Sequence, residues 1–183
     1  MSGKNVNKQT HATAACDSSS TQMSPRWILS NISKDVLKEV EAIVDEEGEL
    51  TENAMRALNS VFGSVLERAI AIVEKPDSVC ELQSPFGRKL VQVSGTSKGV
   101  YTLYPEENYC PCEAFHYFVL GANASELTCK HVLAAWLARI LGEATQRTIS
   151  EEEMTSLLLT LLVSDDSKSV VPNSFEPTAG DKL

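Results

Sequence analysis

Two short motifs contain the residues of this 183-residue chain whose types and spacing could do chemistry. Cys110 and Cys112 form a C-x-C pair, and after a spacer of sixteen residues Cys129 and His131 form a C-x-H pair. In extended backbone, residues i and i+2 point the same way, so each pair can offer both side chains to one ion. Three thiolates and one imidazole make a tetrahedral ligand set for Zn²⁺. The motifs therefore predict one bound zinc ion.

The predicted site leaves no open position on the metal, so we expect a structural zinc in a protein that is not an enzyme. A catalytic zinc keeps one coordination position for water, whereas four protein ligands leave none. His116 is a rival ligand, which we interpret as a partly exposed helix residue. Cys80 is expected to pack as a small apolar side chain, and Cys16 to be a free thiol. The sequence also lacks the patterns G-x-x-x-x-G-K-[ST] and G-x-G-x-x-G, and we expect no small-molecule substrate.

Composition narrows the classes of protein to which the chain can belong. Its 25 acidic side chains outnumber its 16 basic ones, and the net charge of −9 disfavours strong DNA binding by the chain alone. No apolar run is long enough for a membrane span, and the first residues do not resemble a signal peptide. Five cysteines, three of them in the two motifs, fit a reducing compartment better than a disulfide framework. The sequons at Asn31 and Asn123 are therefore interpreted as unmodified.

The elements that must position the ligands follow from hydrophobic periodicity, which predicts an α+β fold. Three short segments rich in β-branched and aromatic residues predict a small antiparallel three-stranded sheet: 79–83, 90–94 and 99–104. A short helix is expected after Cys112, and an amphipathic helix follows His131 and ends at Gly142. Further helices are predicted at 33–48, at 51–73 with Gly63 as a weak point, and after 150, where Ser150 and Glu153 have capping-box spacing.

These elements divide the chain into five segments. They are a disordered tail (1–30), a helical arm (31–75), a zinc-finger module (76–147), a leucine-rich C-terminal helix (148–164) and a disordered acidic tail (165–183). The module carries six basic and seven acidic side chains and is nearly neutral. The negative charge therefore belongs mainly to the helices and the tail around it.

The order C-x-C, spacer, C-x-H, followed three residues after His131 by Ala134, resembles the SWIM-type zinc finger. Over about residues 35–163, including the stretch SPFGRKLVQVSGTSKGVYTLYPEENYCPCEAFHYFVL, the chain resembles the SWIM-domain subunit of the Shu complex. The resemblance implies a nuclear, non-enzymatic accessory factor of homologous recombination. It would form an obligate heterodimer with a RecA-like recombinase paralogue and support the recombinase filament on single-stranded DNA. Ala134, one helical turn after His131, would let its helix approach the ligand-bearing hairpin closely.

Two sets of residues are candidates for contacts with these partners. The partner protein is expected on the apolar surface of two helices, with intramolecular packing as the alternative: Leu157, Leu158, Leu161 and Leu162, and secondarily Phe62 and Leu66. The clustered basic residues of the module are candidates for contact with the DNA backbone, or else solvated turn residues: Arg88, Lys89, Lys98 and Lys130.

Two other functions remain open from the sequence. SWIM segments also occur in transposase-derived proteins that bind DNA directly and in ubiquitin-ligase components. This chain has no basic stripe and no RING-type C-x-x-C clusters, so both alternatives rank below the recombination factor.

Overall fold

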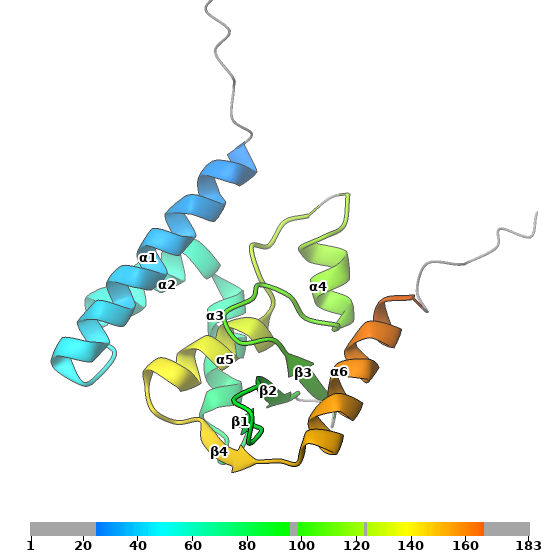
Figure 1. Cartoon of the computed structure of the whole chain (residues 1–183). Coiled ribbons are helices and arrows are strands. Elements are labelled where there is room, and N and C mark those ends of the chain that lie inside the picture. Colours follow the sequence, from blue (N-terminus) through cyan, green and yellow to red (C-terminus); the bar gives the residue numbers. More distant parts are fainter. Residues whose placement is uncertain (1–24, 96–98, 123, 167–183) are drawn as a thin grey trace, which may run out of the picture.

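The computed structural model describes residues 25–95, 99–122 and 124–166, and the side chains within 33–95, 99–122 and 124–162. Along the chain the elements are α1 (Pro25–Glu47), α2 (Glu52–Phe62), α3 (Ser64–Val73), β1 (Val79–Gln83), β2 (Lys89–Ser94), β3 (Val100–Leu103), α4 (Glu113–Phe118), α5 (Lys130–Ile140), β4 (Thr145–Thr148) and α6 (Glu151–Asp166) (Figure 1). The α+β prediction is confirmed. No helix among the described residues has the length and apolar character needed to cross a membrane.

The sheet has four strands in the order β3-β2-β1-β4, one more than the sequence predicted. The meander β1-β2-β3 is antiparallel as expected, but β4 pairs in parallel with β1, with Cys80 opposite Thr145 and Gln83 opposite Thr148. The segment TQRT carries no apolar alternation because both of its faces are largely exposed. Backbone pairing to the edge of β1, rather than burial of side chains, holds this strand in place.

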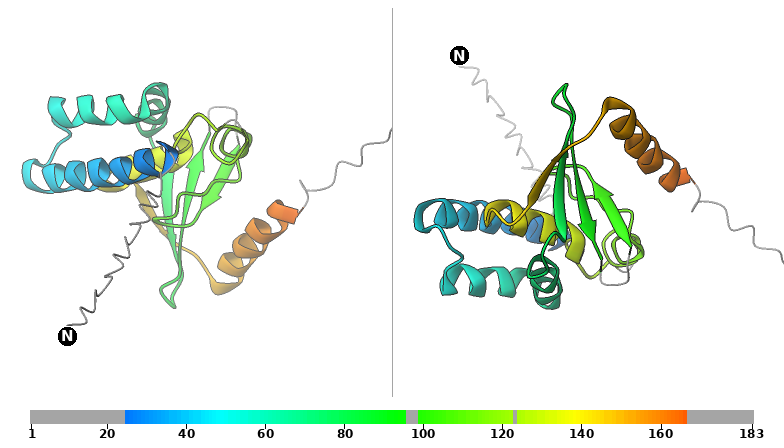
Figure 2. Two further views of the ribbon diagram at one scale, coloured as in Figure 1. Left: turned by 90° about the horizontal axis from the view of Figure 1, so that it is seen from above. Right: turned by 90° about the horizontal axis from the view of Figure 1, so that it is seen from below.

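The main core lies between one face of the sheet and the helices α1, α2, α3 and α5 (Figure 2). α5 packs against both α3 and the strands β1 and β2. Alternation along the strands directs Val91, Val93 and Leu103 to this face, where they share a core with Leu133 and Leu137 of α5. The helix that carries two of the four candidate ligands is therefore held directly against the sheet.

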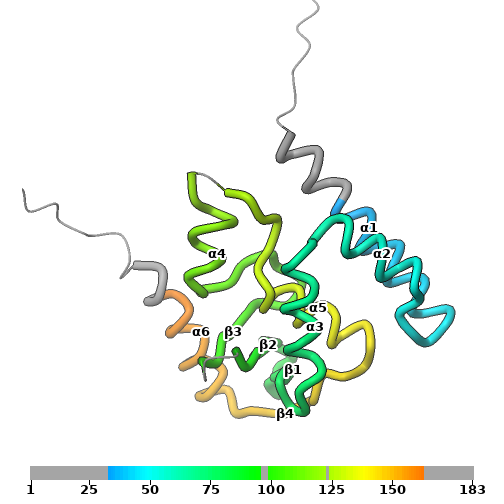
Figure 3. Tube along the Cα trace, turned by 180° about the vertical axis from the view of Figure 1, so that it is seen from behind, coloured from blue at the N-terminus to red at the C-terminus, as the bar shows by residue number. Residues whose placement is uncertain are grey.

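The other face of the sheet is covered by α6, on the side away from α1 and α2 (Figures 2 and 3). Leu82 and Leu90 contact Met154 and Leu161 in a second, smaller core. The predicted capping box is confirmed on one side, because the Glu153 N–H donates to Ser150 Oγ at 3.1 Å. Glu151 anchors the helix by accepting from the Phe86 N–H and pairing with Arg88 in the turn between β1 and β2.

Two helix predictions need correction. α1 begins at Pro25 rather than at Ser33, so residues 25–30 are helical and not part of a tail; proline suits a first helical turn because it needs no N–H partner there. The helix predicted over 51–73 is two helices, because Gly63 has a φ of 49° and a ψ of −129°, a conformation that breaks the helix and that glycine tolerates. The remaining parts of both predicted tails (1–24 and 167–183), with Cys16, and the sequon residue Asn123 lie outside the described residues.

Candidate metal centre

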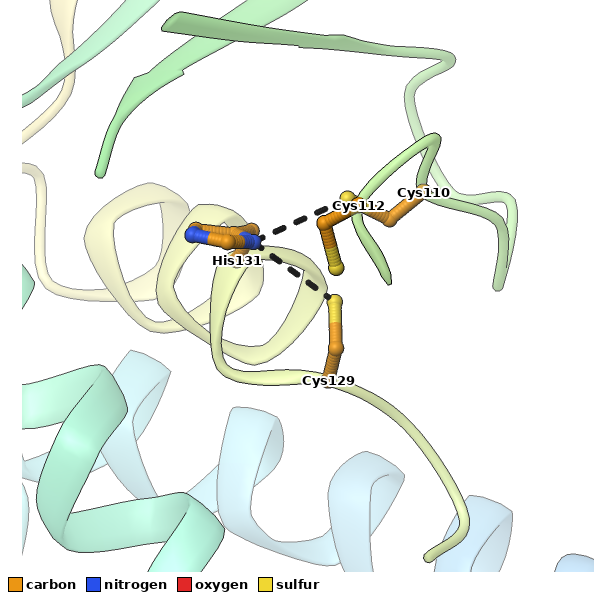
Figure 4. A group of neighbouring side chains, drawn as sticks. All are labelled: Cys110, Cys112, Cys129 and His131. Carbon is orange, nitrogen blue, oxygen red and sulfur yellow. Dashed lines mark hydrogen bonds between the residues drawn. The ribbon is translucent and has the colours of Figure 1, made fainter. Parts of the chain in front are cut away.

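The four predicted ligands are brought together from two places in the chain (Figure 4). Cys110 and Cys112 follow β3, and Cys112 is the N-cap of α4, where its Sγ accepts from the Phe115 N–H at 3.3 Å. Cys129 is the N-cap of α5, and His131 lies in the first turn of that helix. Both pairs stand at helix starts, where free N–H groups and the helix dipole favour thiolate charge.

The geometry of the cluster fits a tetrahedral metal. Its four ligand atoms lie within 4.8 Å of one another, and all four residues are buried. His131 Nδ1 is 3.7 Å from Cys110 Sγ and 4.0 Å from Cys129 Sγ. With a Zn–S bond of about 2.3 Å, the ligand atoms around zinc stand about 3.8 Å apart, so these distances need little adjustment. The three cysteines of the cluster are not joined by disulfides, so all three sulfur atoms are available as ligands.

The three thiols of the cluster shift one another's pKa values. The Cys110 and Cys129 thiols hydrogen-bond to the Cys112 sulfur and hold the pKa of Cys112 far below its usual value. The same bond to Cys112 holds the proton on Cys110 and raises its pKa strongly. The bond with Cys110 lowers the pKa of Cys129, but the bond with Cys112 and burial outweigh it and raise that pKa to about 11. Without a metal, the negative charge of the cluster is therefore favoured on Cys112.

The rival ligand lies outside this cluster. His116 is half-buried on α4, where its ring meets the edge of Tyr109, as expected for a helix residue. Cys80 is half-buried in β1 and packs beside the smaller core. Ala134 has no exposed surface and lies three residues after His131 on α5. Its role in the close approach of that helix stays a prediction.

Sequence reasoning missed the aromatic neighbour of the site. The Tyr101 ring stacks on the His131 ring, with centroids 4.0 Å apart and an angle of 28° between their planes. Tyr101 pairs with Val93 across the sheet, and strand alternation places both residues on the face toward α5. That alternation was the available signal, but nothing local indicated which helix residue Tyr101 would meet.

The candidate partner residues separate into buried and exposed groups. Phe62 and Leu66 belong to the main core, and Leu161 belongs to the smaller one, so the expectation that these three form an open surface is corrected. They are buried because α2, α3 and α6 turn these sides toward the chain's own helices and sheet. Leu157 and Leu158 are half-buried, whereas Leu162 is 63% exposed.

Among the described residues, Arg88, Lys89 and Lys130 do not form the cluster that the sequence suggested. Arg88 pairs with Glu151, and Lys98 lies outside the described residues. Lys89 begins β2. Lys130 begins α5, next to the candidate ligand His131. The His131 ring stacks on Tyr101, which pairs with Val93 near the end of β2, so Lys130 lies near the end of β2 that is far from Lys89. The remaining described lysines are therefore separated by most of a strand length.

An apolar groove of about 390 Å³ lies between α1, α5 and the sheet, and the sequence did not indicate it. Its walls include Leu37, Leu103, Val132 and Trp136. Residues next to both ligand pairs also line it, since Asn108 precedes Cys110 by two positions and Thr128 directly precedes Cys129. The metal site and the groove thus share the same loops.

Comparison with known proteins finds relatives that match most of the chain. Zinc finger SWIM domain-containing protein 7 of Danio rerio is 35% identical over 130 residues, which are 71% of this chain and 91% of that protein. The Homo sapiens protein of the same name is 33% identical over 132 residues, 72% of this chain and 93% of that protein. A homolog from Dictyostelium discoideum is 22% identical over 112 residues, 61% of this chain and 71% of that protein. No family model matches the chain, and no solved structure matches it significantly.

Proposed function

The chain belongs to the family of zinc finger SWIM domain-containing protein 7, and on this basis we propose that it is a non-enzymatic, zinc-binding subunit of a Shu-type complex. It holds one structural zinc ion and pairs in the nucleus with a RecA-like recombinase paralogue, which supplies the ATP site. The pair supports assembly or stability of the recombinase filament on single-stranded DNA in homologous recombination. The buried Cys₃His cluster, in a chain whose relatives are named SWIM domain-containing proteins, carries this proposal.

In this proposal the zinc ion has a structural role. It joins the loop after β3 to the start of α5, and the same two segments are linked by a hydrogen bond from Thr128 Oγ1 to Asn108 Oδ1 at 2.7 Å. Asn108 Nδ2 also donates to the Leu127 carbonyl at 2.9 Å. Because these residues line the apolar groove, loss of the ion would loosen a wall of the groove as well as the site itself.

The surface supports a role in protein association. α6 is apolar around most of its circumference, yet it buries only one side against the sheet and leaves Leu159 and Leu162 more than half exposed. Exposed apolar side chains of this kind are typical of surfaces that bind other proteins. The apolar groove between α1, α5 and the sheet is a second, separate apolar surface. The recombinase paralogue is the partner that we assign to these surfaces.

The charges support contact with DNA mainly through that partner. A protein that grips the DNA backbone gathers Lys and Arg on one face. Here the net charge is −9, and two arginines beside α6 are already paired with its carboxylates, Arg88 with Glu151 and Arg147 with Glu153. The isolated chain is therefore expected to bind single-stranded DNA weakly.

Co-expression of the full chain with the recombinase paralogue of the same organism tests the proposal. The double variant Cys129→Ser/His131→Ala removes two ligands, and Cys80→Ser is the matched control because Cys80 is outside the site. We expect a 1:1 complex with one zinc per chain for the natural protein and the control, measured by co-purification and elemental analysis. The double variant should lose both the zinc and the partner.

Three results would contradict parts of the proposal. A natural chain that does not co-purify with the paralogue refutes the pairing. A zinc-free double variant that keeps the partner separates the metal site from the function. Strong, salt-dependent binding of the isolated chain to single-stranded DNA favours a direct DNA-binding finger instead.

A further inference from the structure

We propose that Tyr101 and Gly95 position the His131 ring so that its Nδ1 atom, and not Nε2, binds the zinc ion. The inference rests on the zinc binding proposed above and adds to it which imidazole nitrogen is the ligand and what holds it there. Tyr101 and Gly95 act through His131 and are positioning residues, because neither supplies an atom to the cluster.

The two nitrogens of His131 have different surroundings. Nδ1 faces the thiols, 3.7 Å from Cys110 Sγ and 4.0 Å from Cys129 Sγ (Figure 4). Nε2 points away from the cysteines, is fully buried, and has no hydrogen-bond partner among the described residues. A neutral imidazole that binds metal through Nδ1 carries its proton on Nε2. The fold therefore buries Nε2 on the side of the ring away from the cysteines, close to Gly95.

The Tyr101 ring lies against one face of the imidazole and limits rotation of the histidine. The two rings are stacked with centroids 4.0 Å apart and planes 28° from parallel. A rotation that brought Nε2 toward the thiols would swing the imidazole plane through the space that Tyr101 occupies. Aromatic stacking of this kind also contributes attraction beyond the area that it buries.

Gly95 lets the end of β2 close over both rings. A Cβ at this position would stand 2.9 Å from Tyr101 Cε2, 3.2 Å from the Gly99 carbonyl oxygen and 3.4 Å from His131 Nε2. The Gly95 N–H also donates to the Gly99 carbonyl at 2.7 Å, so the backbone has little freedom to move away. A methyl group there would push the Tyr101 ring against the imidazole and turn Nδ1 away from the cysteines.

Gly99 offers a matched control on the same turn. Among the described residues, the three atoms nearest to a Cβ at Gly99 all belong to Tyr101, at 3.5–3.6 Å, which is ordinary van der Waals contact. Neither glycine needs a positive φ. The two alanine variants therefore differ in contact with the tyrosine and the histidine rather than in backbone strain.

The test measures metal binding by the full chain and four variants. Zinc affinity is measured by chelator competition, and Co²⁺ is used as a spectroscopic probe of the ligand geometry. We expect Gly95→Ala and Tyr101→Leu to lower zinc affinity about 10- to 100-fold, the usual effect of losing support around a metal ligand, and to shift the Co²⁺ absorption bands. Gly99→Ala and Tyr101→Phe should keep the affinity within about twofold, because both retain the stacked ring.

A second measurement uses the natural protein, so its result does not depend on whether a variant folds. ¹⁵N NMR of the histidine ring in the zinc-bound natural protein should show the metal on Nδ1 and the proton on Nε2. Metal on Nε2, or unchanged affinity and Co²⁺ spectra in Gly95→Ala and Tyr101→Leu, overturns the inference. If Gly95→Ala and Tyr101→Leu lose the same unfolding free energy with and without zinc, these residues have a purely structural role, and the inference is overturned as well. If the natural chain takes up neither metal, the proposed zinc binding itself has failed.

Discussion

Substitutions at the two ends of α6 should separate side chains that hold this helix from side chains that are free to bind a partner. Met154 has no exposed surface and sits in the smaller core with Leu82 and Leu90. Leu162 is 63% exposed and Leu159 is 56% exposed on the same helix. Met154→Ala is the perturbation of folding, and the double variant Leu159→Gln/Leu162→Gln is the perturbation of binding.

The magnitudes follow from burial. Replacing a fully buried Met by Ala costs about 2–5 kcal/mol in protein cores, and the lower part of that range applies here because the cluster is small and at the edge of the fold. The double variant Leu159→Gln/Leu162→Gln should change the unfolding free energy by no more than about 0.5 kcal/mol per residue, since neither side chain fills a core position. Gln is a good helix former and adds no charge, so the helix itself should persist.

Three assays distinguish the two effects. Urea unfolding should give a lower stability for Met154→Ala, and native-state hydrogen exchange should show the loss concentrated in α6, because this helix has few contacts elsewhere. Co-purification with the recombinase paralogue should weaken at least tenfold in the double Gln variant, which corresponds to about 1.4 kcal/mol. Loss of stability in the double Gln variant, or Met154→Ala with unchanged exchange in α6, would refute this account of the helix. An unchanged complex would remove the exposed leucines from the interface.

Zinc at 100 times its dissociation constant should raise the unfolding free energy by about 2.7 kcal/mol, measured by urea titration with and without chelator, and His131→Ala should abolish this gain. The pKa of Glu151 is lowered by its hydrogen bond with Ser84, then by the Phe86 N–H and Arg88. The stability that this anchor contributes is therefore present at neutral pH. It is lost as the pH falls from 4.5, the pKa of Glu151 in the unfolded chain, through its lower pKa in the folded chain. Glu151→Gln should flatten that part of the pH–stability curve. Gly63→Ala should lower stability by about 1–3 kcal/mol in thermal unfolding, because the φ of 49° with a ψ of −129° disfavours any side chain. The new Cβ would have no described atom within 4 Å, so a clash is not the cause. Equal stability of Gly63→Ala and the natural protein would show that the helix break does not need glycine.

The local features of this protein could be predicted well. Two residue pairs of identical spacing indicated the ligand set, and capping residues and apolar periodicity indicated most helix ends. The failures have physical causes. The strand β4 is held by backbone pairing and has no apolar pattern that could predict it. The apolar stripe predicted along 51–73 continues past Gly63, so it gives no sign of the change of helix direction that the backbone conformation of Gly63 produces. The start at Pro25 lies upstream of the periodic region from which the helix was predicted.

The sequence by itself determined the donor chemistry, the helix that follows His131 and the acidic balance, because these depend on residue types and on contacts between near neighbours in the chain. Only the tertiary structure decided which apolar residues remain exposed, since that depends on which faces of helices and sheet meet. It buried Phe62 and Leu66, left Leu162 open, and separated Lys89 from Lys130. It also stacked Tyr101 on His131 by bringing β3 and α5 together across thirty positions of chain. Long-range packing of this kind orients the imidazole, and no local spacing encodes it.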